Sequence, residues 1–374
     1  MNIKSLSTLA LGMLLLASCA SDDVTTTALN ETSEYVPGNS EYPVRLHGST
    51  AVSATTRAAV EGNETDPRAV LDRMGIFSLA RDKQGVNESA GDIQWWNNTH
   101  NWSDCLMDNV LARMENGDIT WEGIYFYPIT QFYSYDFYGY YPYTEDLTRT
   151  NNSVTAHYTI DGTNDLIWGR ATSDEDYAYS AKYYRTYGTS AVDPTLDLKH
   201  LLTRLVFTAE PGESYVGSGD YTEAENMQVK SIKLCDVYTN LDVLIAEFDN
   251  AENSNPDYAR RLTLRDEVTD TLSLCDETGE PFALTQVPAH TEDPLQIGES
   301  IMLYPANQYV VRVALIDANG EEHVSEIPLM LSTAGGFLRG NSYTVRVIVH
   351  GPRAIEVKGN LTPWNDVDGP ILEL

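Results

Sequence analysis

The side chains that could do chemistry are spread along the sequence rather than grouped. There is no HExxH motif, no paired-cysteine zinc spacing and no glycine-rich phosphate loop. Residues 212–216 lack the final glycine of a nucleophile elbow, and residues 365–369 resemble a calcium loop without its distal glutamate. The sequence therefore predicts a protein that is not an enzyme and that holds no metal and no cofactor. The histidines behind this prediction are His47, His100, His157, His200, His290, His323 and His350.

Cys19 is the side chain whose setting most directly predicts a modification. Lys4 precedes an apolar run from Leu6 to Ala17 that is too short to span a bilayer, so residues 1–18 read as an export signal. Small residues directly before Cys19 resemble the bacterial lipobox, in which the cysteine becomes the N-terminus and receives acyl chains such as palmitate. Residues 21–23 are similar to the surface-export signal of Bacteroidota lipoproteins. An ordinary cleaved signal with a chance cysteine is the alternative.

The composition excludes some partners and sets the number of domains. With 24 Lys and Arg against 55 Asp and Glu, the formal charge is −31, and such a surface repels nucleic-acid phosphates. Residues 19–41 carry almost no large apolar side chains and are predicted to form a flexible tether. More than 300 residues remain, which exceeds a usual single core and indicates two domains.

Short alternating segments predict an all-β fold. Helical periodicity is scarce, and runs rich in Val, Ile, Tyr, Phe and Thr recur between turn residues. Alternation resumes at Leu196 after a polar stretch, residues 172–194, that reads as a loop or connection. We therefore expect one domain over residues 42–195 and a second over residues 196–374. The expected strands lie at 42–47, 75–80, 196–207, 229–237, 241–248, 300–304, 308–316 and 342–350.

Residues 121–143 are dominated by aromatic side chains. Exposed Tyr and Trp rings stack on sugars, so this tract supports an alternative function as a surface-exposed glycan-binding lipoprotein. The spacing of the aromatic residues fits the buried faces of two strands better than it fits a binding surface.

The cysteines allow at most one intramolecular disulfide. If Cys19 is acylated, Cys105, Cys235 and Cys275 remain as an odd set. Cys235 and Cys275 fall in the same predicted domain and form the better candidate pair, while free buried thiols are the alternative.

The C-terminus is unusually apolar. Ordinary chain ends are frayed and polar, so something must cover these side chains. Either the tail completes the sheet of its own domain, or it is donated to another molecule. The apolar residues concerned are Ile355, Val357, Leu361, Trp364, Ile371, Leu372 and Leu374.

Several segments, taken in order, resemble the fimbrillin family, the subunits of Bacteroidota type V pili. The resemblance implies two tandem transthyretin-like Greek-key β-sandwich domains after a lipoprotein signal peptide, and it covers most of the exported chain. Its pieces are Cys19 with its preceding residues, Arg57 within residues 54–58, the strand 75–80, the tract ending at Tyr143, and the segments 165–168, 199–202, 300–305 and 341–364.

The resemblance also implies how subunits assemble. Residues 42–57 would form a removable strand with Tyr42, Val44 and Leu46 inward, and a trypsin-like, arginine-specific protease would cut after Arg57. Arg45 and Arg68 are competing sites, and an ordinary loop arginine is the alternative reading of Arg57.

The vacated groove would then accept a strand from another pilin subunit, with the apolar C-terminal residues as donors. Before processing, the protein would be a surface-exposed lipoprotein held in the outer membrane by its lipid, and afterwards part of the fimbrium.

Overall fold

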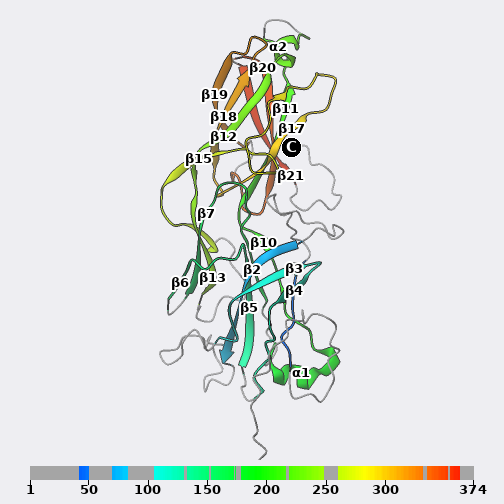
Figure 1. The fold of residues 1–374 in the computed structure, drawn as a ribbon, viewed down its shortest axis with the longest axis vertical. Helices are drawn as coiled ribbons and strands as arrows, with labels where there is room; N and C mark the ends of the chain where they lie inside the picture. The colour runs from blue at the N-terminus through cyan, green and yellow to red at the C-terminus, as the bar shows by residue number, and fades with distance from the viewer. Residues whose placement is uncertain are drawn as a thin grey trace, which may run out of the picture.

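The computed structural model describes residues 42–49, 70–82, 105–129, 133–150, 153–171, 173, 178–215, 219–247, 260–331, 335–352 and 354–362. Nearly all regular structure in these ranges is β-strand, so the predicted all-β class is confirmed. The molecule is elongated, with β18, β19 and β20 toward one end and β3, β4 and β5 toward the other (Figure 1). Within these ranges no helix is both long and apolar enough to cross a bilayer.

The central strands of an eight-stranded sheet are buried on both faces. Alternate residues of one strand enter different cores, because Ile76 packs into one cluster and Phe77 into the other. Only β1 and β9 are parallel neighbours, and the remaining pairs are antiparallel. The order is β10-β8-β5-β2-β3-β4-β1-β9. The bounds are β1 Leu46–Gly48, β2 Val70–Asp82, β3 Met107–Glu115, β4 Asp118–Trp121, β5 Tyr133–Tyr141, β8 Ile167–Ala171, β9 Thr195–Leu196 and β10 Lys199–His200.

A four-stranded side sheet covers one of these two faces. Its order is β14-β13-β7-β6, and Val243 on β13 and Ala156 on β7 share a core cluster with Phe77. The bounds are β6 Leu147–Arg149, β7 Ser153–Thr159, β13 Asn240–Glu247 and β14 Leu262–Leu264.

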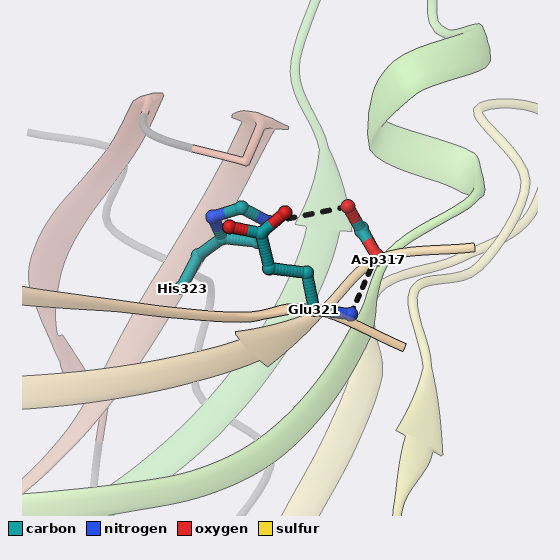
Figure 2. Close-up of side chains that lie close together, drawn as sticks. All are labelled: Asp317, Glu321 and His323. Carbon is teal, nitrogen blue, oxygen red and sulfur yellow. Dashed lines mark hydrogen bonds and ion pairs between the residues drawn. The ribbon is translucent and has the colours of Figure 1, made fainter. Parts of the chain in front are cut away.

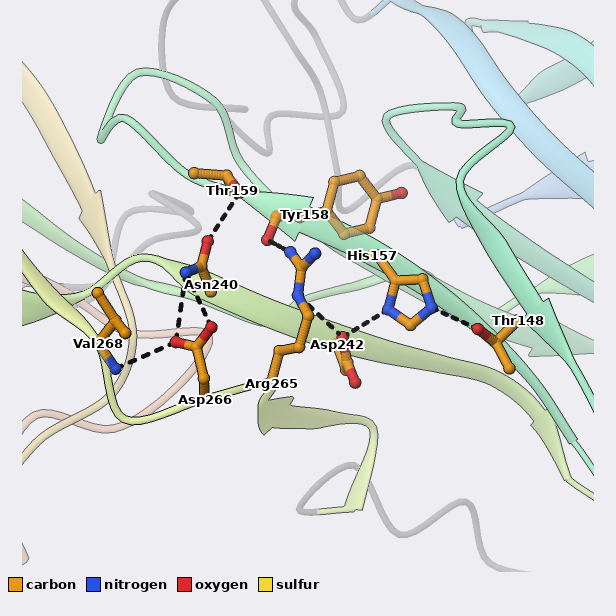
Figure 3. A network of polar contacts seen from close by, with 9 residues as sticks. All are labelled: Thr148, His157, Tyr158, Thr159, Asn240, Asp242, Arg265, Asp266 and Val268. Atoms are coloured by element: carbon orange, nitrogen blue, oxygen red, sulfur yellow. Dashed lines mark hydrogen bonds and ion pairs between the residues drawn. The ribbon is translucent and has the colours of Figure 1, made fainter.

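Polar side chains join the strands of the side sheet on its outer face (Figure 3). His157 Nδ1 lies 2.7 Å from Asp242 Oδ1 on β13, and His157 Nε2 lies 2.7 Å from Thr148 Oγ1 on β6. Arg265, just after β14, donates to the carbonyl of Tyr158 on β7. The network therefore fixes the register of strands that are far apart in sequence.

Two further sheets face each other in the upper part of the molecule as drawn in Figure 1. One runs β17-β11-β20-β21 and the other β15-β12-β18-β19, with β16 pairing β12. The alternation expected in residues 342–350 is confirmed, since Tyr343, Val345, Val347 and Val349 are all buried. The bounds are β11 Thr203–Pro211, β12 Gln228–Tyr238, β15 Thr269–Ser273, β16 Thr285–Gln286, β17 Leu295–Leu303, β18 Gln308–Ile316, β19 Glu322–Met330, β20 Ser342–Gly351 and β21 Ala354–Thr362.

The polar stretch before residue 195 contains a helix that the sequence reading missed. Helix α1 (Ala181–Tyr187) begins after Ser180, whose hydroxyl accepts a hydrogen bond from the Tyr183 amide. Its buried tyrosines pack under the eight-stranded sheet, and the 3₁₀ turn η2 (Gly188–Ser190) follows. The prediction of a loop was wrong here because one short helix gives too few turns for a periodic pattern. Helix α2 (Thr222–Glu225) lies at the opposite end of the molecule (Figure 1).

The sheets do not divide at residue 195. Strands β9 and β10 complete the eight-stranded sheet, and β13 joins the side sheet although only Thr239 separates it from β12. Residues 240–247 and 262–264 therefore join the N-terminal strands β6 and β7 rather than the sheet of β12 and β15. Alternation alone could not reveal this, because a strand has the same pattern whichever sheet receives it.

Cys235 and Cys275 are free thiols, so the candidate disulfide is not formed. Lys233 lies opposite Ser273 in an antiparallel pair, and the amide of Leu274 bonds to the carbonyl of Ile232. The two strands run in opposite directions, so Cys275 lies level with residue 231, about four residues from Cys235. That offset is about 13 Å along a strand, beyond the reach of a disulfide.

Candidate functional site

The described residues 42–49, called here the N-terminal segment, lie between two neighbours. On one side the Val44 amide donates to Tyr125 O at 2.8 Å and the Gly48 amide donates to Gly117 O at 2.8 Å. On the other side the His47 amide donates to Pro194 O at 3.0 Å and the Ser49 amide donates to Leu196 O at 2.8 Å. The segment therefore occupies a slot between β4 and β9, with backbone hydrogen bonds along both walls.

Three apolar side chains of the N-terminal segment enter the core beneath the eight-stranded sheet. Tyr42 and Val44 are each 5% exposed and Leu46 is fully buried, so the inward orientation predicted for them is confirmed. Each side chain of this kind contributes about 1.5–3 kcal/mol when fully buried. Whether the segment is removed from the slot stays a prediction.

The slot fits its occupant closely at Gly48. A Cβ atom at this position would lie 2.4 Å from Met114 Sδ and 3.0 Å from Leu198 Cδ1. These contacts come from core side chains on β3 and just after β9, so any strand that replaces the segment must also carry a small residue here or move its neighbours.

His47 ties the segment to both walls of the slot. Its Nδ1 lies 3.0 Å from Asp118 Oδ1 on β4, and its Nε2 lies 3.8 Å from Asp193 Oδ2 just before β9. The interaction with Asp193 and then that with Asp118 raise the pKa of His47 above its ordinary value of 6.5, against the lowering effect of partial burial. Sequence reading counted His47 only among scattered histidines, because the two aspartates meet it solely through the fold.

A pocket of about 350 Å³ opens beside the segment. Arg45 and Asp193 supply its charged groups, and Tyr184 donates its hydroxyl to Asp193 at 2.9 Å. Arg45 itself sits between residues whose backbones are hydrogen-bonded into the slot. A protease that needs an extended substrate would therefore have to extract the segment before cutting at Arg45.

The C-terminal candidates divide between two situations. Ile355, Val357 and Leu361 belong to β21, which pairs with β20 over nine positions and forms the edge of its own sheet. Ile355 and Val357 are partly buried, and Leu361 is 58% exposed. In this arrangement the first part of the tail completes its own sheet, which is the alternative that the sequence left open.

Several predicted site residues lie outside the described residues. These are Cys19, Arg57, Trp364, Ile371, Leu372 and Leu374. Lipid attachment at Cys19 and cleavage after Arg57 therefore stay predictions.

Several aromatic side chains of the tract belong to the core, whereas Phe126 is 38% exposed. Tyr127, Phe137, Tyr138 and Tyr140 are all nearly or fully buried. Tyr127 stacks on Tyr184 of α1 with ring centroids 5.4 Å apart, so the helix missed by sequence reading completes this core.

Solved structures of proteins from Bacteroides and Porphyromonas are similar to this chain at low sequence identity. One is a Bacteroides uniformis protein provisionally described as a cell adhesion protein, with 14% identity and a TM-score of 0.49, and the match covers 87% of this chain and 100% of that one. Another is a fimbrial protein from Bacteroides vulgatus, with 15% identity and a TM-score of 0.45, and the match covers 86% of this chain and 99% of that one. The chain is also similar to the fimbrial anchor protein Mfa2 from Porphyromonas gingivalis, with 12% identity and a TM-score of 0.33, and the match covers 86% of this chain and 98% of that one. No curated protein matches it. A family model described as fimbrillin-like matches residues 56–364, and the chain therefore belongs to the fimbrillin-like family.

Proposed function

We propose that this protein is a pilus subunit that is exported as a lipoprotein, cut after Arg57 and assembled by strand donation. One observation carries the proposal: the N-terminal segment fills a slot between two strands and buries three side chains there. Its removal would leave two rows of unpaired backbone groups above an apolar floor. Membership of the fimbrillin-like family supports the same role.

The partners follow from this mechanism. A strand from another subunit would restore the hydrogen bonds with β4 and β9, and alternate apolar side chains would refill the floor. An arginine-specific protease would expose the slot, and acylated Cys19 would hold the precursor in the outer membrane until then.

The donor is the C-terminal tail. Among the described strands, β21 is hydrogen-bonded to β20 alone, so its release costs one ladder together with the packing of Ile355 and Val357. The sequence beyond it adds four further large apolar residues, Trp364, Ile371, Leu372 and Leu374. The donated stretch therefore includes residues after Thr362 and extends into β21 if that strand is released.

The glycan-binding alternative has lost the observation that motivated it. Five aromatic side chains of the tract that suggested stacking on sugars are buried in the core, namely Tyr127, Tyr135, Phe137, Tyr138 and Tyr140. The family model that matches residues 56–364 is described as fimbrillin-like, which supports a pilus role instead.

Controlled proteolysis of the chain from residue 20 onward tests the proposal. We expect a trypsin-like protease to produce an N-terminus at Ala58, followed by oligomers that persist in unheated detergent gels. R57A should block both events, whereas the matched variant R68A should still be cut and still assemble. A fully trimmed protein that stays monomeric at high concentration would refute strand donation.

Truncation separates the two parts of the proposed donor. Deletion of residues 363–374 should abolish the oligomers while leaving cleavage intact. If the truncated protein still assembles and L361D prevents assembly instead, the donor is β21 itself.

A further inference from the structure

The hairpin between β18 and β19 carries three potential ligands at its tip. Asp317 follows β18, and its Oδ1 accepts hydrogen bonds from the amides of Asn319 at 2.9 Å and Glu321 at 2.8 Å. These bonds hold the carboxylate in one orientation and leave Oδ2 facing His323 on β19 (Figure 2). Gly320 adopts φ +81°, the left-handed conformation that closes a turn of this kind.

The distances suit a small metal ion better than a strong hydrogen bond. Asp317 Oδ2 lies 3.3 Å from His323 Nε2, and one ligand atom from each of Asp317, Glu321 and His323 lies within 4.8 Å of the others. Charge-assisted hydrogen bonds are shorter, at about 2.7–2.9 Å. Ligand atoms bound at about 2.0–2.1 Å to a tetrahedral zinc ion lie about 3.3–3.4 Å apart. The observed separation matches one edge of that tetrahedron.

The donor set and its surroundings favour zinc over calcium. One imidazole and two carboxylates are ligands that zinc accepts, whereas calcium takes about six to eight oxygens. The side chains of Asp317 and His323 are only 15% and 12% exposed, so two of the three ligands are already held in place. Glu321 is exposed and can turn toward the ion without disturbing the core.

We propose that Asp317, Glu321 and His323 form a binding site for a divalent transition-metal ion, with Zn²⁺ as the best fit and water in the remaining position. The ion would join the turn to the first residues of β19, which is an edge strand with a neighbour on one side only. Because two of its ligands flank the turn, a bound ion would restrain the hairpin at the end of the molecule that also carries α2 (Figure 1).

Titration of the untagged chain from residue 20 onward with zinc chloride, followed by calorimetry, tests the site. We expect one ion per chain, and at least about tenfold weaker binding in H323Q and in D317N. D317N is informative because asparagine keeps the oxygen that accepts from the turn amides while losing the charge. The matched control is H290Q, which removes an exposed histidine that contacts Glu225 outside the cluster.

Cobalt absorption gives a second readout that does not depend on affinity. Bound Co²⁺ should show the intense visible bands of a tetrahedral site in the wild type and in H290Q, and should lose them in H323Q. Circular dichroism establishes that each variant is folded. Absence of binding by the wild type at millimolar zinc, or equal affinity in the wild type, H323Q and D317N, overturns the proposal.

Discussion

The N-terminal segment and β21 contain the first and last strands of the described residues, yet the fold holds them in different ways. The segment lies between β4 and β9 and points three side chains into a core, whereas β21 lies at a sheet edge and leaves Leu361 exposed. Removing an inner strand opens a slot with two walls, while removing an edge strand only exposes the next edge. The N-terminal segment therefore has the properties of a strand that fills an acceptor groove, and β21 has those of a strand that can be donated.

The largest expected difference concerns one leucine in each strand. L46A should destabilise the protein by about 2–5 kcal/mol, because Leu46 is fully buried in the slot. L361A should change stability by less than about 0.5 kcal/mol, because that side chain is largely in solvent. Chemical denaturation of both variants measures the contrast. Equal costs would mean that the two strands are held alike.

A pair of glycines sharpens the comparison. G48A should cost about 1–3 kcal/mol, since its Cβ would come within 2.4 Å of Met114 Sδ. In β21, the nearest atom to a Cβ at Gly359 is Leu331 Cδ2 at 3.1 Å, so G359A needs only a small adjustment and should be nearly neutral. Thermal unfolding of the two variants provides the test. A neutral G48A would show that the slot is looser than the structure indicates.

The smallest expected effect depends on pH and involves only the N-terminal segment. The pKa of His47 is raised in the folded protein. The contribution of His47 to the stability of the fold is therefore fully present below about pH 6.5, and it is lost as the pH rises through the pKa that His47 has in the folded protein. His47 is 40% exposed, so solvent screening limits the effect to about 1 kcal/mol or less.

The test is to measure stability at roughly pH 5.5 to 8.5, a range that brackets the ordinary histidine pKa of about 6.5. As the pH rises, the stability of H47Q should decline less steeply than that of the wild type. K358Q serves as the control, because Lys358 contacts Glu356 within β21 rather than either wall of the slot. Identical pH profiles for the wild type and H47Q would show that His47 does not stabilise the attachment of the segment to β4 and β9.

Sequence reading located strands well where the signal is local. The expected strand 308–316 coincides with β18, and the alternation in residues 342–350 appears in β20, because the facing of side chains follows directly from backbone geometry. The inward orientation of Tyr42, Val44 and Leu46 was predicted for the same reason. Helix α1 was missed because its tyrosines belong to a core assembled from distant segments.

The amino-acid sequence by itself determined the β class, the strand positions, the acidic surface and the alternation of the N-terminal segment. Only the tertiary structure decided which strands become neighbours: it inserted β1 between β4 and β9, sent β13 to the N-terminal core and kept Cys235 away from Cys275. It also brought Asp118 and Asp193 to His47. The physical reason is that alternation is fixed within a strand, whereas pairing and register depend on long-range packing and hydrogen bonds that one strand's sequence does not specify.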